Sequence, residues 1–252
     1  MKRIFERVGR ALGEYLTRDG HPSSASPATN LTLLRKFLRP ADVLLVEGSS
    51  RVSTAIKYLT QSTWSHAALY VGDVAKLGHR DGHPLEFVEA DVSKGVRAVS
   101  LHAFDGLHCR ICRPINLSPD DTAKVIKFAV DRIGHRYDLK NLFDLARYLV
   151  PTPPVPTRWR RRMIALGSGD PTKAICSTLI AEAFESVRYP VLPEVTTVSA
   201  SSVSCPNCIA QILAVRHHSL FVPRDFDVSP YFAVIKPSLS EEFNYKSLTW
   251  AA

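Results

Sequence analysis

The sequence predicts an α+β fold for most of the chain. From Leu31 onward, short segments with the two-residue alternation of strands are interspersed with segments whose apolar residues recur at helical spacing. Of the 252 residues, 45% are hydrophobic and 22% are charged, so the chain can bury a substantial core in one large domain or in two small ones. We therefore expect an ordinary folded protein.

The expected elements follow one another closely between residues 31 and 134. Helices are predicted at 31–38, near 51–60 and at 118–134, and the last of these opens with a serine cap and a proline in its first turn. Strands are predicted in the segments DVLLVEG (42–48), SHAALYVG (65–72), LEFVEADV (85–92) and CRICRPINL (109–117). Strand and turn patterns return in residues 217–237, and no internal repeat is found.

The two ends and one internal segment differ from this pattern. Residues 1–30 are expected to form a basic amphipathic helix (1–18) and a linker rich in Ser, Pro and Gly. The globular domain is expected to span 31–238, with a C-terminal tail at 239–252. Near 150–174 lies the segment VPTPPVPTRWRRRMIALGSGDPT, whose prolines and glycines exclude a helix or strand and which could act as a lid.

The N-terminal helix has two open interpretations. Its apolar stripe is formed by Ile4, Phe5, Val8, Leu12, Tyr15 and Leu16. Basic residues occupy other positions of the same helix: Lys2, Arg3, Arg7, Arg10 and Arg18. Such a helix can lie among the headgroups of an anionic membrane, or it can pack on its own domain or on a second subunit.

Composition narrows the class of partner and the location. No stretch reaches the roughly 20 apolar residues of a membrane-spanning helix, and no secretory signal is recognised, so we expect a cytoplasmic protein or one peripheral at the inner face of the membrane. The net charge of +8 favours acidic partners, namely nucleic acid, anionic lipid or an acidic substrate. The arginines of RWRRRM are confined to one proline-flanked loop, which disfavours nucleic acid.

Four of the five cysteines form two CxxC pairs, Cys109 with Cys112 and Cys205 with Cys208. Together they could be read as a four-thiolate zinc site. However, strand geometry would point Cys109 and Cys112 to opposite faces, so we expect reduced cysteines and neither a metal nor a cofactor. Cys176 is the cysteine left over.

Cys176 stands at the start of a helical run in the segment KAICSTLIAEAFESVRYP, residues 173–190. The apolar residues that recur there at helical spacing are Leu179, Ile180, Ala183, Phe184 and Val187. In the first turn, the positive end of the helix and an imidazolium partner would stabilise a thiolate. A cysteine in an apolar helix is also commonly a small core residue, so both interpretations remain open.

A thiol nucleophile needs a base, and the base needs an orienting group. Period-2 geometry predicts two strand faces, one with Trp64, His66, Ala68 and Tyr70 and the next with Phe87, Glu89 and Asp91. If these faces lie together, His66 approaches Glu89, and Cys176 would face them. A strand histidine is also commonly structural, and a strand glutamate commonly faces water. Other sets stay open, with His79, His83 or His135 as base and Glu86 or Asp91 as acid.

Four segments in this order carry a resemblance to a known family: TWSHAALYVGD, FVEADVSKGV, GHRYD and ICSTLIAEAF. From about Arg39 to Pro237 the chain resembles the YiiX/YebB-like cysteine hydrolases, the circularly permuted branch of the NlpC-type, papain-like superfamily. The resemblance implies an antiparallel sheet or partial barrel packed against helices, including the helix that carries the nucleophile. It also implies a nucleophile at Cys176, a base at His66 and an orienting acid at Glu89.

Further residues expected from this resemblance to line the site are Tyr137, Asp138 and Ser177. Relatives commonly have Glu where this chain has Thr178, and the proline-rich insert is longer than a minimal member needs. Both differences lie next to the expected cleft, so they bear on substrate preference.

The expected chemistry is acyl transfer from an amide or ester, of a peptide or a lipid, through an acyl-enzyme intermediate. The backbone amide of Cys176 is the expected first donor to the oxyanion. Water as acceptor would give a peptidase, amidase or esterase, whereas an alcohol or amine would give an acyltransferase. A lipid-directed acyltransferase or lipase, and a catalytically silent lipid-binding module, are the alternatives.

Overall fold

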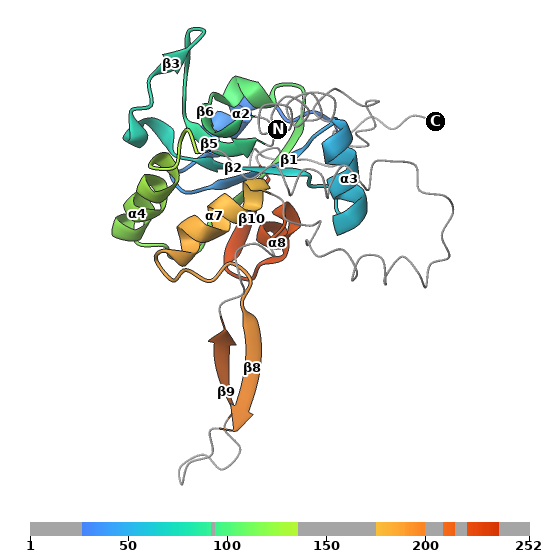
Figure 1. The fold of residues 1–252 in the computed structure, drawn as a ribbon, viewed down its shortest axis with the longest axis vertical. Coiled ribbons are helices and arrows are strands. Elements are labelled where there is room, and N and C mark those ends of the chain that lie inside the picture. The colour runs from blue at the N-terminus through green and yellow to red at the C-terminus, as the bar shows by residue number, and fades with distance from the viewer. Residues whose placement is uncertain (1–26, 92–93, 136–174, 200–208, 215–220, 237–252) are drawn as a thin grey trace, which may run out of the picture.

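The computed structural model describes residues 27–91, 94–135, 175–199, 209–214 and 221–236. Several expectations fall outside these ranges: the N-terminal helix, most of the linker, the proline-rich insert, the C-terminal tail, the second CxxC pair, and both Tyr137 and Asp138. Within the described ranges the fold is mixed helix and sheet, which confirms the α+β prediction (Figure 1).

A six-stranded antiparallel sheet forms the centre of the molecule, in the order β10-β7-β1-β2-β5-β6. Its strands are β1 (Val43–Glu47), β2 (His66–Tyr70), β5 (Phe87–Asp91), β6 (Gly95–Val99), β7 (His108–Pro114) and β10 (Phe232–Ile235). Two hairpins stand apart from the sheet, β3 (His79–Arg80) with β4 (His83–Pro84), and β8 (Glu194–Ser199) with β9 (Ile209–Ala214). The β8–β9 hairpin extends away from the main body (Figure 1).

The helices surround this sheet. They are α2 (Leu31–Phe37), α3 (Arg51–Thr60), α4 (Pro119–Val130), α7 (Ile175–Glu185) and α8 (Pro223–Val228), with short 3-10 turns η1 (Gly72–Ala75) and η2 (Leu101–Phe104). Asn30, Ser50 and Ser118 cap α2, α3 and α4 through their side-chain oxygens. No helix in the described ranges combines the length and apolarity needed to cross a membrane.

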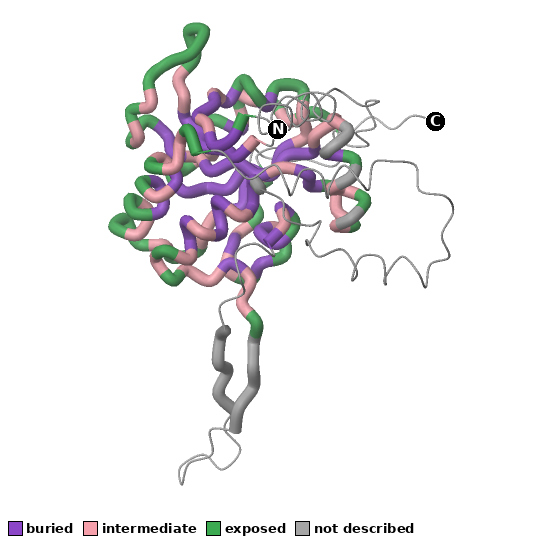
Figure 2. Tube along the Cα trace, in the orientation of Figure 1, coloured by how far each residue is buried: buried purple, intermediate pink, exposed green. Residues whose placement is uncertain are grey.

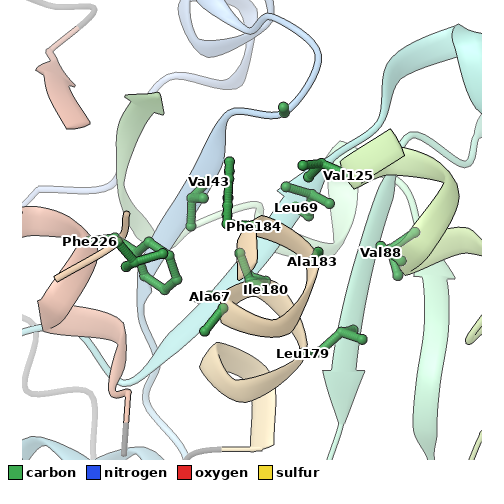
Figure 3. Packing of buried hydrophobic residues seen from close by; sticks show 14 of the residues in the cluster. Val43, Ala67, Leu69, Val88, Val125, Leu179, Ile180, Ala183, Phe184 and Phe226 are labelled. Carbon is green, nitrogen blue, oxygen red and sulfur yellow. The ribbon is translucent and has the colours of Figure 1, made fainter. Parts of the chain in front are cut away.

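Buried apolar residues lie on both faces of the sheet (Figure 2). One face packs against α7 and α4, and the other packs against α2 and η2. Figure 3 shows Leu179, Ile180 and Ala183 of α7 among residues of β2 and β5. Helix α7 is thus buried along most of its length, which fixes the position of its first turn.

Ala183 is fully buried in the core between α7 and the sheet. We expect Ala183→Leu to lower the free energy of unfolding by about 1–3 kcal/mol, because the added carbon atoms have no space. The measurement is chemical denaturation, with Ala103→Leu as the matched control at an exposed position of η2. Equal effects of the two substitutions would contradict this account of the packing.

Candidate active site

His66 and Glu89 meet where β2 and β5 pair. The antiparallel register sets Ala68 opposite Glu89, so His66, two residues earlier in β2, lies diagonal to Glu89 on the same face. His66 Nε2 lies 2.7 Å from Glu89 Oε2. Because a carboxylate only accepts hydrogen bonds, Nε2 donates, which leaves Nδ1 free for another partner.

Cys176 reaches His66 from the first turn of α7. It is only 5% exposed, and it lies close enough to His66 for its charge to raise the pKa of that imidazole. Since Nε2 is bound to Glu89, Nδ1 remains the ring nitrogen available to a further partner. The three side chains therefore form a chain from Cys176 through His66 to Glu89, carried by α7, β2 and β5.

The electrostatics of His66 favour a protonated ring. Burial by itself would lower the pKa of His66, but the adjacent negative charges of Cys176 and Glu89 outweigh burial and raise that pKa well above its ordinary value. The His66 side chain retains 25% exposure, so it can exchange protons with solvent. This arrangement favours the imidazolium form of His66.

Glu89 is kept ionised by two cationic neighbours. Burial by itself would raise the pKa of this 4% exposed carboxyl, yet its contacts with His66 and Arg97 hold the pKa below its ordinary value. Arg97 Nε lies 2.9 Å and Nη2 lies 2.7 Å from Glu89 Oε1. Thus Oε1 binds Arg97, while Oε2 binds His66.

Arg97 was missed by the sequence analysis, which predicted no strand at 95–99. The signal that could have found it is the short hairpin VEADVSKGVR, because pairing β5 with β6 around its turn sets Glu89 opposite Arg97. A carboxylate and a guanidinium directly opposite each other on paired strands form a favourable pair.

Of the alternative acids and bases, Asp91 lies beside Glu89, and the others lie elsewhere in the described structure. Glu86 is bound to Arg35 at the opposite end of β5, and His79 and His83 are exposed in the β3–β4 hairpin. Asp91 lies near Glu89, where its Oδ2 is 3.6 Å from Arg97 Nη2. His135 is exposed just after α4.

Trp64 does not share the strand face of His66, contrary to the expectation. Strand β2 begins at His66, so the two-residue alternation does not extend back to Trp64. The Trp64 ring instead lies in the core on the α7 side, stacks on His108 and donates from Nε1 to Asp227 at 3.1 Å.

Ser177 also differs from its expected place. Its side chain is 0% exposed and donates to the Phe221 carbonyl at 2.7 Å. Helical spacing turns this residue about 100° away from Cys176, toward the segment that leads into α8. Ser177 therefore anchors α7 and does not line the site with its side chain.

Cys109 and Cys112 lie on opposite faces of β7, as period-2 geometry predicts, because they belong to the two separate core clusters. Burial raises the pKa of Cys109 to about 12, and it also raises the pKa of Cys112. No group of three or more potential metal ligands is found within the described residues. Of the three described cysteines, Cys176 is the one bound to a histidine.

Comparisons with known proteins add no family assignment. A scan of the chain against models of protein families finds no match, and a search of curated proteins finds no significant match. The inference of function therefore rests on the arrangement of these side chains.

We expect Cys176→Ala to lower the pKa of His66. The substitution removes the anionic sulfur that stabilises the imidazolium, while the opposing effect of burial remains, so the ring loses its proton at lower pH. NMR titration of the His66 ring carbons measures this change. Cys112→Ala, which removes a buried thiol of β7, is the control and should leave the titration unchanged. An unaltered His66 pKa in Cys176→Ala would contradict the placement of Cys176 beside the imidazole.

Proposed function

We propose that this protein is a thiol-dependent hydrolase that cleaves an amide or ester bond through an acyl-enzyme intermediate. Cys176 is the nucleophile, His66 the general base and acid, and Glu89 the group that orients the imidazole. The observation that supports this proposal is the continuous chain Cys176–His66–Glu89, in which a buried helix-start thiol contacts a histidine held by a buried carboxylate.

The reaction divides into two acyl transfers. His66 takes the thiol proton, and the sulfur of Cys176 attacks the substrate carbonyl to form a tetrahedral oxyanion. The C–O or C–N bond then breaks, and His66 returns the proton to the leaving group. In the second half, His66 draws a proton from water, whose oxygen attacks the thioester and releases the acid, and the proton passes back to the thiol.

The backbone amide of Cys176 is the proposed donor to the oxyanion. The first N–H groups of an α-helix have no partner within the helix, and Cys176 is the second residue of α7. Losing one oxyanion donor typically raises the barrier by about 3 kcal/mol. The start of α7 would thus supply both the nucleophile and part of the stabilisation of the transition state.

A circularly permuted papain-like fold is part of this proposal. Its support is the order of the elements: the histidine strand β2 and the acid strand β5 precede α7 along the chain. Helix α7 packs against β2 and β5, and Cys176 in its first turn lies beside His66 although 110 positions of the sequence, 66 to 176, separate the two residues.

Turnover of p-nitrophenyl esters and of peptide anilides tests the assignment. We expect Cys176→Ala to lower kcat by roughly 1,000-fold or more, because the reaction loses its nucleophile. Glu89→Gln should lose less than Cys176→Ala, since the amide oxygen still accepts a hydrogen bond from the ring. Glu86→Gln is the control, because it alters a buried glutamate at the other end of β5. Near-wild-type turnover in Glu89→Ala would overturn the role of Glu89.

A lipid acyl group is the second candidate substrate, and the path of the chain favours it. The Pro27 carbonyl lies 3.2 Å from Nδ1 of His108, and Thr29 is hydrogen-bonded to the backbone of Cys109. Cys109 and His66 both pair with Val46, so the first described residues lie at the same end of the sheet as the candidate site.

The chain that follows residues 1–26 therefore enters the described domain at the end of the sheet that carries the candidate site. The eight residues 19–26 span at most roughly 30 Å when extended. If the basic amphipathic segment binds an anionic surface, the site would be held near the lipid, and an acyl ester in the bilayer becomes an accessible substrate.

Deletion of residues 1–18 separates the two interpretations of this segment. We expect the intact protein to sediment with vesicles of phosphatidylglycerol and phosphatidylcholine, to bind less at high salt, and to lose binding after the deletion, with alkylation of Cys176 unchanged. Phosphatidylcholine vesicles without anionic lipid are the control. If deletion lowers the melting temperature and leaves vesicle binding intact, the segment packs on protein and the lipid candidate loses this support.

A further inference from the structure

We propose that Arg97 is a positioning residue, which fixes the Glu89 carboxylate so that Oε2 is directed at His66. The effect of Arg97 on catalysis rests on the proposed function, whereas its contact with Glu89 does not depend on that function. The candidate site thus extends beyond the three residues of the chain Cys176–His66–Glu89 to the neighbouring strand β6.

The hydrogen bonds divide the two oxygens of Glu89 between two partners. Both Nε and Nη2 of Arg97 contact Oε1, at 2.9 and 2.7 Å, and His66 contacts Oε2 at 2.7 Å. Two donors on one oxygen fix the rotation of the carboxylate as well as its position. Rotating the group to offer Oε1 to His66 would break both bonds to Arg97.

The position of Arg97 is itself fixed from two sides. The register pairs Arg97 directly with Glu89 across β5 and β6, and its Nη2 also lies 3.6 Å from Asp91 Oδ2. The Arg97 side chain is 28% exposed, so the guanidinium covers the almost fully buried carboxylate while keeping contact with water. Arg97 thus spans both acidic residues of β5 that face it.

This second cation changes what Glu89 does when His66 gives up its proton. If His66 were the sole partner, deprotonation of the ring would leave a buried carboxylate uncompensated, and that cost would hold the proton on His66. With Arg97 present, Glu89 remains paired in both states of the ring. Arg97 therefore makes the His66 proton easier to release, as a base that acts twice in each cycle requires.

Cys176 of α7 and Glu89 of β5 are the groups that raise the His66 pKa, while Arg97 of β6 pairs with Glu89 and also faces Asp91. Removing the Arg97 charge takes away a cation near the imidazolium, so the His66 pKa should rise further. A role confined to joining β5 to β6 would change stability without this effect.

Arg35 provides a matched control within the same fold. Its Nη2 lies 2.6 Å from Oε1 of Glu86, a glutamate that is also almost fully buried, at the opposite end of β5. Arg35→Gln therefore removes an arginine from a buried glutamate just as Arg97→Gln does, but at Glu86, three residues before Glu89 along the chain.

The experiment compares Arg97→Gln, Arg97→Lys and Arg35→Gln. In Arg97→Gln we expect a higher His66 pKa by NMR, an alkaline limb of the pH–rate profile displaced to higher pH, and kcat for p-nitrophenyl ester lower by roughly tenfold. Arg97→Lys keeps the positive charge but loses the two-nitrogen contact of the guanidinium. Its His66 pKa should therefore equal that of the wild type, and its kcat should lie between those of the wild type and Arg97→Gln. Arg35→Gln should lower the melting temperature and change neither quantity.

The proposal is overturned if Arg97→Gln leaves the His66 pKa at the wild-type value and lowers only the melting temperature, as Arg35→Gln does. The NMR titration needs no substrate, so it decides the role of Arg97 even if the wild-type protein turns over no ester or amide. Absence of turnover in the wild type together with a raised His66 pKa in Arg97→Gln would reject the proposed function and leave the positioning role intact.

Discussion

Burial of the Glu89 carboxylate is the constraint on which the candidate site depends. An ionised carboxyl that is 4% exposed is tolerated in a protein interior only if its charge and both oxygens are matched by partners. Here β2 supplies His66 to one oxygen and β6 supplies Arg97 to the other. A slip of one residue in either pairing would turn a partner to the opposite face, so this interaction also specifies the register of three strands.

The candidate site also requires that the Cys176 thiol lie beside the His66 ring, and the packing of α7 holds it there. Leu179, Ile180 and Ala183 are fully buried against β2 and β5, so the helix cannot shift along the sheet without opening cavities. Ser177 adds a buried hydrogen bond to the segment that leads into α8. The packed core behind α7 therefore holds Cys176 at the N-terminus of the helix and beside the imidazole, so that both act on its sulfur.

The features of the fold and of the candidate site that depend on local sequence could be predicted, whereas those that depend on tertiary packing could not. Period-2 alternation put His66 and Glu89 on faces that could meet, and helical spacing put Cys176 in a first turn, because both are local properties of the sequence. Arg97 was missed because β6 follows β5 after a short turn, and its five residues did not stand out as a strand. Trp64 and Ser177 were misplaced because strand limits and helix rotation toward a neighbour are set by tertiary packing. The catalytic roles remain predictions.

Mass spectrometry of a trapped acyl-enzyme tests the central claim most directly. The protein is mixed briefly with a p-nitrophenyl ester, quenched in acid to preserve a thioester, digested and mapped. The account predicts one acyl group on Cys176, removable by hydroxylamine and absent from His66→Ala under the same conditions. An unmodified Cys176, or acyl groups spread over lysines and the other cysteines to the same extent in the wild type and in His66→Ala, would contradict it.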